Sequence, residues 1–290
     1  MQYTQKNSRK TLSAFILLPA IVVALSLQGC AHDEKTPVNV QELAVTKQEP
    51  QPAPSPETPA PPAPIIEQYA LDRLKQMSER LTSSKAFTYK SNSFIELQVD
   101  SGQFITFFTD VDVALQRPNK LRINALGDLP NFQIYFDGAK VSAFDKQKNL
   151  HAVSEPITTI DEMLAFVISK VHLNFPSADL MYSNPYAVMT KNLTQAVVIG
   201  PSMVNGVPCE HFAYMEPGIN WEIWIENGKN ALPLRLAMTY KQAPNFPRFL
   251  VEFSDWNLKP KLSPETFVFK APADSKKIEF GPYKIEQKTK

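Results

Sequence analysis

The sequence predicts an α+β fold: a curved antiparallel sheet of about ten strands with helices over its concave face. Apolar and polar residues alternate in two long blocks, and turn signals recur roughly every eight to twelve residues, as in a meander. One amphipathic helix precedes the first block, and a helical segment over 159–189 separates the two blocks. An open sheet of that width curls, and its apolar face needs either helices or a ligand over it.

Residues 1–29 have the features of a secretory signal peptide. A polar, basic start over 1–10 is followed by an uncharged apolar run over 12–27. As a helix this run would cover about 24 Å, which is short of the ~30 Å hydrocarbon core of a bilayer. Pro19 also interrupts the run, so a cleaved signal is favoured over a transmembrane anchor.

The end of this run is similar to a bacterial lipobox, in Leu27, Gly29 and Cys30, although Gln28 replaces the usual small residue. The resemblance implies that Cys30 becomes the first mature residue and carries a diacylglycerol and an amide-linked fatty acid. Two or three acyl chains, at about 0.8 kcal/mol per buried CH₂, anchor a protein stably where one does not. Ala31 is not the Asp that retains such lipoproteins at the inner membrane, which implies anchoring at the periplasmic side of the outer membrane of a Gram-negative bacterium.

The stretch 30–64 is predicted to be a disordered, proline-rich tether. Its prolines gather in 49–64, where they remove backbone donors and favour polyproline II, so these residues alone span roughly 50 Å. A proline-rich docking motif is the alternative interpretation. The tether would hold a folded domain, residues 65–283, away from the membrane, and a polar tail would follow over 284–290.

Composition limits the partners of this domain. The chain has 290 residues, 43% apolar content and a net charge of +1, and loss of the three basic residues of the signal takes the charge to −2. No basic tract remains, which argues against a nucleic-acid partner.

The elements of the domain follow from local patterns. Apolar positions spaced three or four apart over 66–81 predict the first helix, and Thr159 with Glu162 forms a capping box that begins a strongly apolar helix ending near 171. Short helical pieces are expected over 177–182 and from 184. The predicted strands are 94–100, 105–115, 121–125, 132–136, 140–144, 194–200, 207–215, 219–225, 232–240 and 249–256.

Motifs of catalysis are not found. Cys209 and His211 share one face of a strand and could form a thiolate dyad, but a structural pair is favoured. Asp110 and Asp112 also share a face, where a solvated edge is favoured over a cation site. The sequence has no metal-ligand spacing, phosphate loop or Gly-x-Ser-x-Gly motif. We therefore expect a protein that is not an enzyme and that uses no cofactor or metal.

Five segments of the second half carry a resemblance: 205–211, 221–225, 232–235, 253–257 and 267–272. In this order they resemble an uncharacterised family of predicted periplasmic proteins that shares the half-barrel fold of LolA, LolB and the mycobacterial lipid-binding lipoproteins. The resemblance implies a hydrophobic cavity between a concave sheet and its helices.

The expected function is to bind a lipid or acyl chain in that cavity, in lipid or lipoprotein handling. The alternative is a tethered structural or assembly partner of an envelope complex, with no small ligand. A core filled by the protein's own aromatic side chains fits the same pattern. The predicted cavity lining is Phe107, Val111, Ile123, Phe166, Ile223, Leu236 and Val251.

Overall fold

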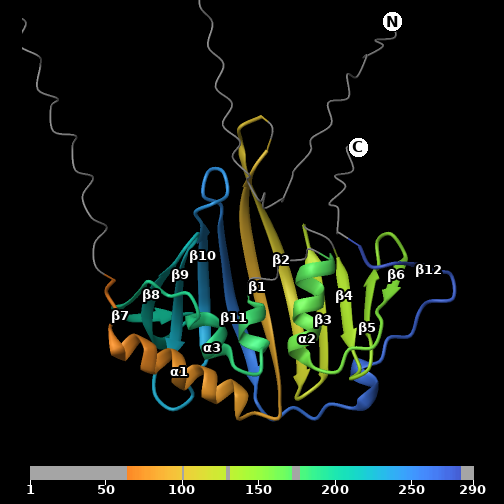
Figure 1. Cartoon of the computed structure of the whole chain (residues 1–290), viewed down its shortest axis with the longest axis horizontal. Coiled ribbons are helices and arrows are strands. Elements are labelled where there is room, and N and C mark those ends of the chain that lie inside the picture. Colours follow the sequence, from red (N-terminus) through yellow and green to blue (C-terminus); the bar gives the residue numbers. More distant parts are fainter. Residues whose placement is uncertain (1–63, 100, 129–130, 172–176, 282–290) are drawn as a thin grey trace, which may run out of the picture. The chain divides into compact units, whose positions relative to one another are not determined.

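The computed structural model describes residues 64–99, 101–128, 131–171 and 177–281 (Figure 1). The predicted signal peptide, Cys30 and most of the tether and tail lie outside the described residues. No helix in the described ranges is long and apolar enough to cross a membrane.

The described strands form one curved, unclosed sheet, which confirms the predicted fold class. The sheet has twelve strands, in the order β12-β6-β5-β4-β3-β2-β1-β11-β10-β9-β8-β7, and every neighbouring pair is antiparallel except β12 with β6. The strands are β1 (Ala86–Gln98), β2 (Phe104–Gln116), β3 (Lys120–Gly127), β4 (Phe132–Phe136), β5 (Val141–Asp145), β6 (Leu150–Val153), β7 (Gln195–Val204), β8 (Val207–Glu216), β9 (Ile219–Glu226), β10 (Pro233–Tyr240), β11 (Arg248–Asn257) and β12 (Lys276–Ile278).

Two strands exceed the predicted number of about ten. The extra strands are β6 and β12, with four and three residues, which are too short to give a period-two pattern. Both lie at the same edge of the sheet. The chain runs from the end of β11, in the middle of the sheet, to this edge, where β12 pairs with β6.

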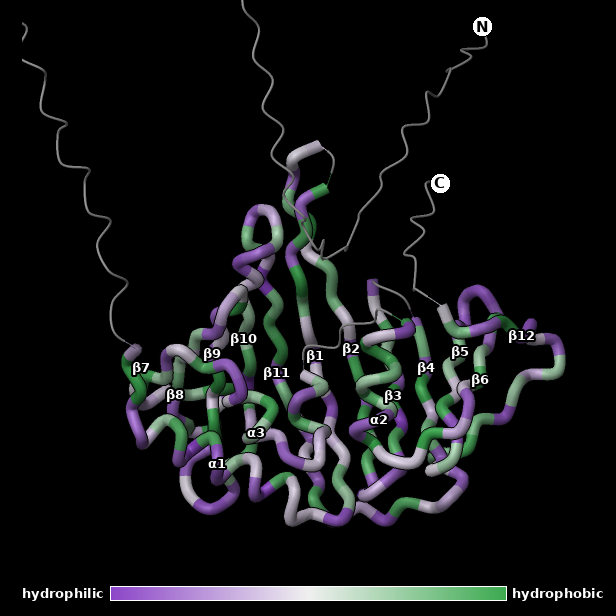
Figure 2. Tube along the Cα trace, in the orientation of Figure 1, coloured by the Kyte–Doolittle hydropathy of each residue, from purple (hydrophilic) through white to green (hydrophobic). Residues whose placement is uncertain are grey.

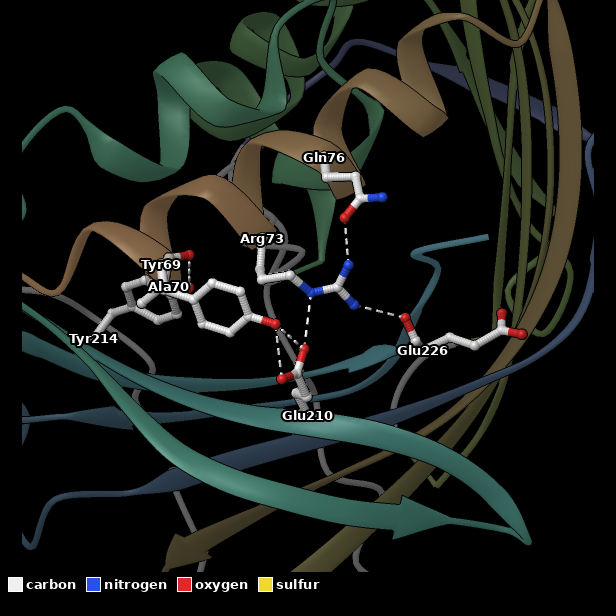
Figure 3. A network of polar contacts seen from close by, with 7 residues as sticks. All are labelled: Tyr69, Ala70, Arg73, Gln76, Glu210, Tyr214 and Glu226. Atoms are coloured by element: carbon white, nitrogen blue, oxygen red, sulfur yellow. Dashed lines mark hydrogen bonds and ion pairs between the residues drawn. The ribbon is translucent and has the colours of Figure 1, made fainter. Parts of the chain in front are cut away.

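The helices lie over the inner, concave face of the sheet (Figures 1 and 3). They are α1 (Gln68–Thr82), α2 (Ile160–Phe166), the π-helical turn η1 (Val167–Val171), the 3₁₀ turn η2 (Ala178–Met181) and α3 (Pro185–Thr190). The predicted capping box of α2 is present, and the backbone N–H of Thr158 lowers the pKa of Glu162 by hydrogen bonding to its carboxylate.

The N-terminal helix begins slightly later than its apolar stripe predicts. Ile66 forms a parallel bridge with Ala196 of β7, and the N–H of Glu67 donates to the Ala196 carbonyl at 2.8 Å. These residues pair with the edge strand β7 before α1 begins, so the backbone groups of β7 at Ala196 are not left open.

The inner face carries the hydrophobic core. Alternate residues of each strand point to it, such as Phe87 and Tyr89 on β1 and Leu236 and Met238 on β10, which are all buried. The strict alternation expected along 232–240 breaks at Leu234. A register shift between Pro233 and Arg235 places Leu234 in a small second cluster with Trp224 and Cys209.

The C-terminal segment crosses the other face of the sheet. Its 3₁₀ turn η3 (Pro264–Phe267) buries Phe267 completely. The next aromatic, Phe269, contacts the rings of Tyr135, Phe144 and His151 at centroid distances of 5.5, 5.7 and 5.7 Å. This end of the sheet is therefore covered on both faces.

Candidate functional site

The first half of the helical cover, α1, is fixed to the sheet by a polar network (Figure 3). Arg73 Nε lies 2.9 Å from Oε2 of Glu210 on β8, and Arg73 Nη2 donates to the carbonyl of Glu226 at 2.9 Å. The Tyr69 hydroxyl donates to both Glu210 oxygens at 2.9 and 3.0 Å. The Arg73 and Glu210 side chains are only 9% and 24% exposed, so moving α1 would separate a largely desolvated ion pair.

A second tie lies one turn from the ion pair. Tyr214 of β8 donates its hydroxyl to the carbonyl of Ala70 at 2.9 Å, and burial raises the pKa of Tyr214. The hydrogen bond to Glu210 likewise raises the pKa of Tyr69. Both phenols therefore stay neutral donors at physiological pH, and α1 is held at two points.

The second half of the cover, α2 with η1, is held differently. Its N-terminal end is tied, because the N–H of Ile160 donates to the Pro118 carbonyl at 3.2 Å and Asp161 Oδ1 accepts from the N–H of Ser183 at 2.8 Å. Beyond that end, Met163 and Val167 are buried against the sheet. Within the described residues, the side-chain hydrogen bond of η1 runs from Ser169 back to its own helix. Apolar packing therefore holds η1 on the sheet.

A cavity of about 10 Å³ lies between this half of the cover and β3–β4. That volume is about the size needed for one water molecule. An acyl chain does not fit in it, and the buried apolar residues of the inner face pack together in one cluster. The lining residues are all apolar: Ile123, Phe132, Ile134, Met163, Leu164, Val167, Ile168 and Ala178.

The seven side chains predicted to line a cavity are not brought together around it. Ile123 is the one that lines the space under α2. Val111, Ile223, Leu236 and Val251 are buried in the core further along the inner face.

The two remaining predicted residues lie apart from these. Phe166 ends α2, where it is half-buried and meets the ring of Phe280 edge-on at a centroid distance of 5.1 Å. Phe107 is half-buried near the free end of β2. Their role in binding stays a prediction.

Sequence reasoning missed most of the lining of the small cavity. Phe132 and Ile134 alternate on one predicted strand, and Met163 and Val167 lie four apart on the predicted helix, so period alone indicated that each pair shares a face. Periodicity does not predict which helix packs over which strand.

A larger concavity, of about 300 Å³, lies on the outer face between β1–β3, the end of β11 and η3. Its lining is mixed and carries charges, among them Lys90, Asp112, Arg122 and Asp255. Lys90 Nζ lies 3.0 Å from Asp255 Oδ2. These groups do not match an acyl chain.

The residues considered for catalysis have structural surroundings. Cys209 is fully buried, and burial raises the pKa of its thiol. His211 stacks on Trp224 at a centroid distance of 4.0 Å and lies 2.9 Å from Glu222, so its ring is held by other partners than the thiol. Asp110 accepts from Asn92 at 2.6 Å. Among the described residues, no cluster of three potential metal ligands is found.

Comparison with known families assigns the chain. Residues 70–281 match the family described as "Predicted periplasmic protein (DUF2092)". The chain belongs to the DUF2092 family. The match covers nearly the whole described domain, and it confirms the resemblance to a family of predicted periplasmic proteins. No curated protein gives a significant sequence match to this DUF2092 chain.

Solved structures similar to this DUF2092 protein include three with very low sequence identity. An uncharacterised conserved protein of Thermus thermophilus is 11% identical, with a TM-score of 0.41 over 73% of this chain and 98% of the other. The Mycobacterium tuberculosis lipoprotein LppX is 13% identical, with a TM-score of 0.38 over 68% and 100%. A LolA superfamily protein of Nitrosomonas europaea is 10% identical, with a TM-score of 0.36 over 71% and 98%.

Proposed function

We propose that this protein is a lipid-anchored periplasmic lipoprotein that takes up one acyl chain or similar apolar ligand between α2–η1 and the inner face of β3–β4. The observation that carries the proposal is the unequal attachment of the two halves of the cover. A largely desolvated ion pair and hydrogen bonds from two phenols hold α1, whereas η1 is held by apolar packing. An apolar ligand could replace that packing at little cost in hydrogen bonds.

The cavity of about 10 Å³ then represents the empty, closed form of the site. Displacement of η1 would join this space to the inner-face core, where the predicted residues Val111, Leu236 and Val251 lie. Ligand binding requires that α2 pivot about its tied end near Ile160.

Ile168 offers a direct test, because it lines the cavity and is also 41% exposed, so the folded state tolerates a change there. Ile168→Glu would place a carboxylate at the entrance, and we expect binding of a fluorescent fatty acid to weaken about tenfold or more, equivalent to about 1.4 kcal/mol. Val268→Glu is the matched control, since Val268 is also 41% exposed but does not line the cavity. Equal affinities for the two variants would contradict the site.

A complementary variant enlarges the space. Met163 is fully buried and lines the cavity, so Met163→Ala should cost about 2–5 kcal/mol of stability while leaving room for a larger ligand. Native mass spectrometry of the purified protein should then detect more copurified lipid than in the wild type. A lipid-free wild type and a lipid-free variant would both speak against a carrier.

The filled inner face also favours a second function, that of a tethered structural or assembly partner of an envelope complex without a small ligand. Cross-linking in cells separates the two. One envelope protein recovered in stoichiometric amount, together with an empty domain, would support the assembly role.

Anchoring at the periplasmic side of the outer membrane is part of the proposal and rests on Leu27, Gly29, Cys30 and Ala31. With the signal intact, Cys30→Ala should abolish incorporation of radiolabelled palmitate and release the protein from sedimented membranes. A variant that still sediments would indicate that the apolar run 12–27 is itself the anchor.

A further inference from the structure

The hairpin of β1 and β2 extends beyond the sheet (Figure 1). On one side, the pairing of β1 with β11 ends at Ile95, and on the other side the pairing of β2 with β3 ends at Thr109. The two strands still pair with each other as far as Gln98 and Phe104. The outer part of the hairpin is therefore a two-stranded ribbon. A ribbon of two strands is at best marginally stable on its own in water.

The inner side of the hairpin is apolar where β11 ends and the two-stranded ribbon begins. Ile95 pairs with Phe107, and Leu97 pairs with Ile105, and all four side chains are half-buried. On the same face, the polar pair of Ser93 and Thr109 separates these four residues from Val111 of the core. Figure 2 shows both hydrophobic and hydrophilic residues along this hairpin.

The outer side of the hairpin exposes two further aromatic residues, Phe104 in the ribbon and Phe108 just before it. Phe104 is 52% exposed and Phe108 is 50% exposed, with Glu96 and Thr106 between them. A groove on a partner protein would cover one side of a ribbon. Apolar residues on both sides instead match the interfacial layer of a bilayer, which surrounds the ribbon and leaves its backbone groups hydrated.

The neighbouring hairpin, between β10 and β11, presents a third exposed ring. Phe246 is 60% exposed, and both it and Asn245 have left-handed backbone conformations, with φ of 49° and 62°. That conformation is strained for a bulky residue and is retained mainly at functional positions. The side chain of Asn245 donates to that of Gln98, which joins the two hairpin ends.

We propose that the ends of these two hairpins insert into the surface of a lipid bilayer through Phe104, Phe108 and Phe246. Aromatic rings are favoured at the boundary of headgroups and acyl chains. The β1–β2 turn carries one acid, Asp100, and the β10–β11 end carries Lys241 and Arg248, of which Arg248 lies 3.3 Å from Glu222. The two ends together therefore carry little net charge, so apolar insertion and not attraction to anionic lipid drives the contact.

The remaining chain brings a bilayer within reach. Residues 31–63 separate the predicted lipid anchor at Cys30 from the described domain, and 33 residues can reach at most about 110 Å when fully extended. The inference uses the anchor of the proposed function only for this proximity, and it does not depend on a ligand at the inner face.

The test is depth-dependent fluorescence quenching in the full, lipidated protein reconstituted into phosphatidylcholine vesicles. Tryptophan is introduced as Phe104→Trp or as Phe246→Trp, and the emission of the native tryptophans is subtracted with the unmodified protein. The quenchers are lipids that carry bromine atoms on their acyl chains close to the headgroup. Because interfacial segments lie about 5–10 Å deep, these lipids should reduce the fluorescence of the introduced tryptophan about twofold. Adding about 20% anionic lipid should change this little.

Ile199→Trp and Met203→Trp are the matched controls. Both residues are also strongly exposed, at 57% and 62%, but belong to β7 at the far edge of the sheet. Vesicle flotation first establishes that each variant is anchored, and circular dichroism that it is folded. Anchored, folded variants in which positions 104 and 246 are quenched no more than positions 199 and 203 would overturn the proposal. A protein that fails to float would instead refute the lipid anchor.

Discussion

Removal of the Arg73 guanidinium tests whether α1 is the fixed half of the cover. Arg73→Met removes the ion pair with Glu210 and the hydrogen bond to the Glu226 carbonyl, each at 2.9 Å. It leaves a carboxylate that is 24% exposed with Tyr69 as its remaining donor. Because breaking one side of a buried pair costs about 3–5 kcal/mol and this pair is partly solvated, we expect a loss of about 3 kcal/mol.

The assay is urea unfolding followed by circular dichroism, supported by thermal melts. For a domain of this size, about 3 kcal/mol corresponds to a fall of roughly 6–12 °C in Tm. Adding Glu210→Gln to Arg73→Met should restore at least about 1 kcal/mol, since the double variant no longer buries an unpaired charge.

An exposed ion pair supplies the control. Arg248 lies 3.3 Å from Glu222, and its side chain is 53% exposed, so Arg248→Met should cost less than about 1 kcal/mol. The reasoning is refuted if the two arginine variants lose equal stability, or if the effects of Arg73→Met and Glu210→Gln simply add.

Two further predictions concern stability. Burial raises the pKa of Asp179 from 3.8 to about 6, with a contribution from the charge of Glu216. Ionisation of Asp179 therefore destabilises the folded state increasingly as the pH rises from 3.8 to above 6. Asp179→Asn should stabilise the fold by up to about 3 kcal/mol at pH 8 and by little at pH 4. Urea midpoints at the two pH values measure this, and parallel pH profiles of variant and wild type would contradict it. A Cβ at Gly127 would lie 2.2 Å from the Phe108 carbonyl oxygen, so Gly127→Ala should cost about 1–3 kcal/mol. Gly281→Ala, which meets no atom within 4 Å, should be neutral in the same melts.

Much of the fold was predictable because several strands alternate between buried and more exposed side chains. The alternation along β3 and the turn signal at Asn205 each specify a local structure without reference to the rest of the chain. By contrast, Lys276–Ile278 becomes a strand only because the chain has crossed the sheet to reach β6. Three residues carry no pattern that anticipates such pairing.

The site was less accessible to prediction, since it depends on contacts between distant segments. Periodicity placed Arg73 beside the apolar stripe of the first helix, but nothing local indicates that it meets Glu210 on β8. In the same way, a pattern shows that Ile123 and Met163 are buried, whereas the space left between them depends on how side chains of several elements fit together.

The pairing of β1 with β11 sets the order in which the chain can fold. Ser91 pairs with Phe253, so the first and last long strands meet at the centre of the sheet. As the chain is synthesised from its N-terminus, β1 to β6 can pair through short hairpins, but the free edge of β1 stays unpaired until β11 has been made. Such long-range closure is slow, and an uncapped edge recruits strands from other molecules. New chains are therefore prone to aggregate until residue 257 is available, and versions truncated before β11 should aggregate more readily because the edge of β1 stays open.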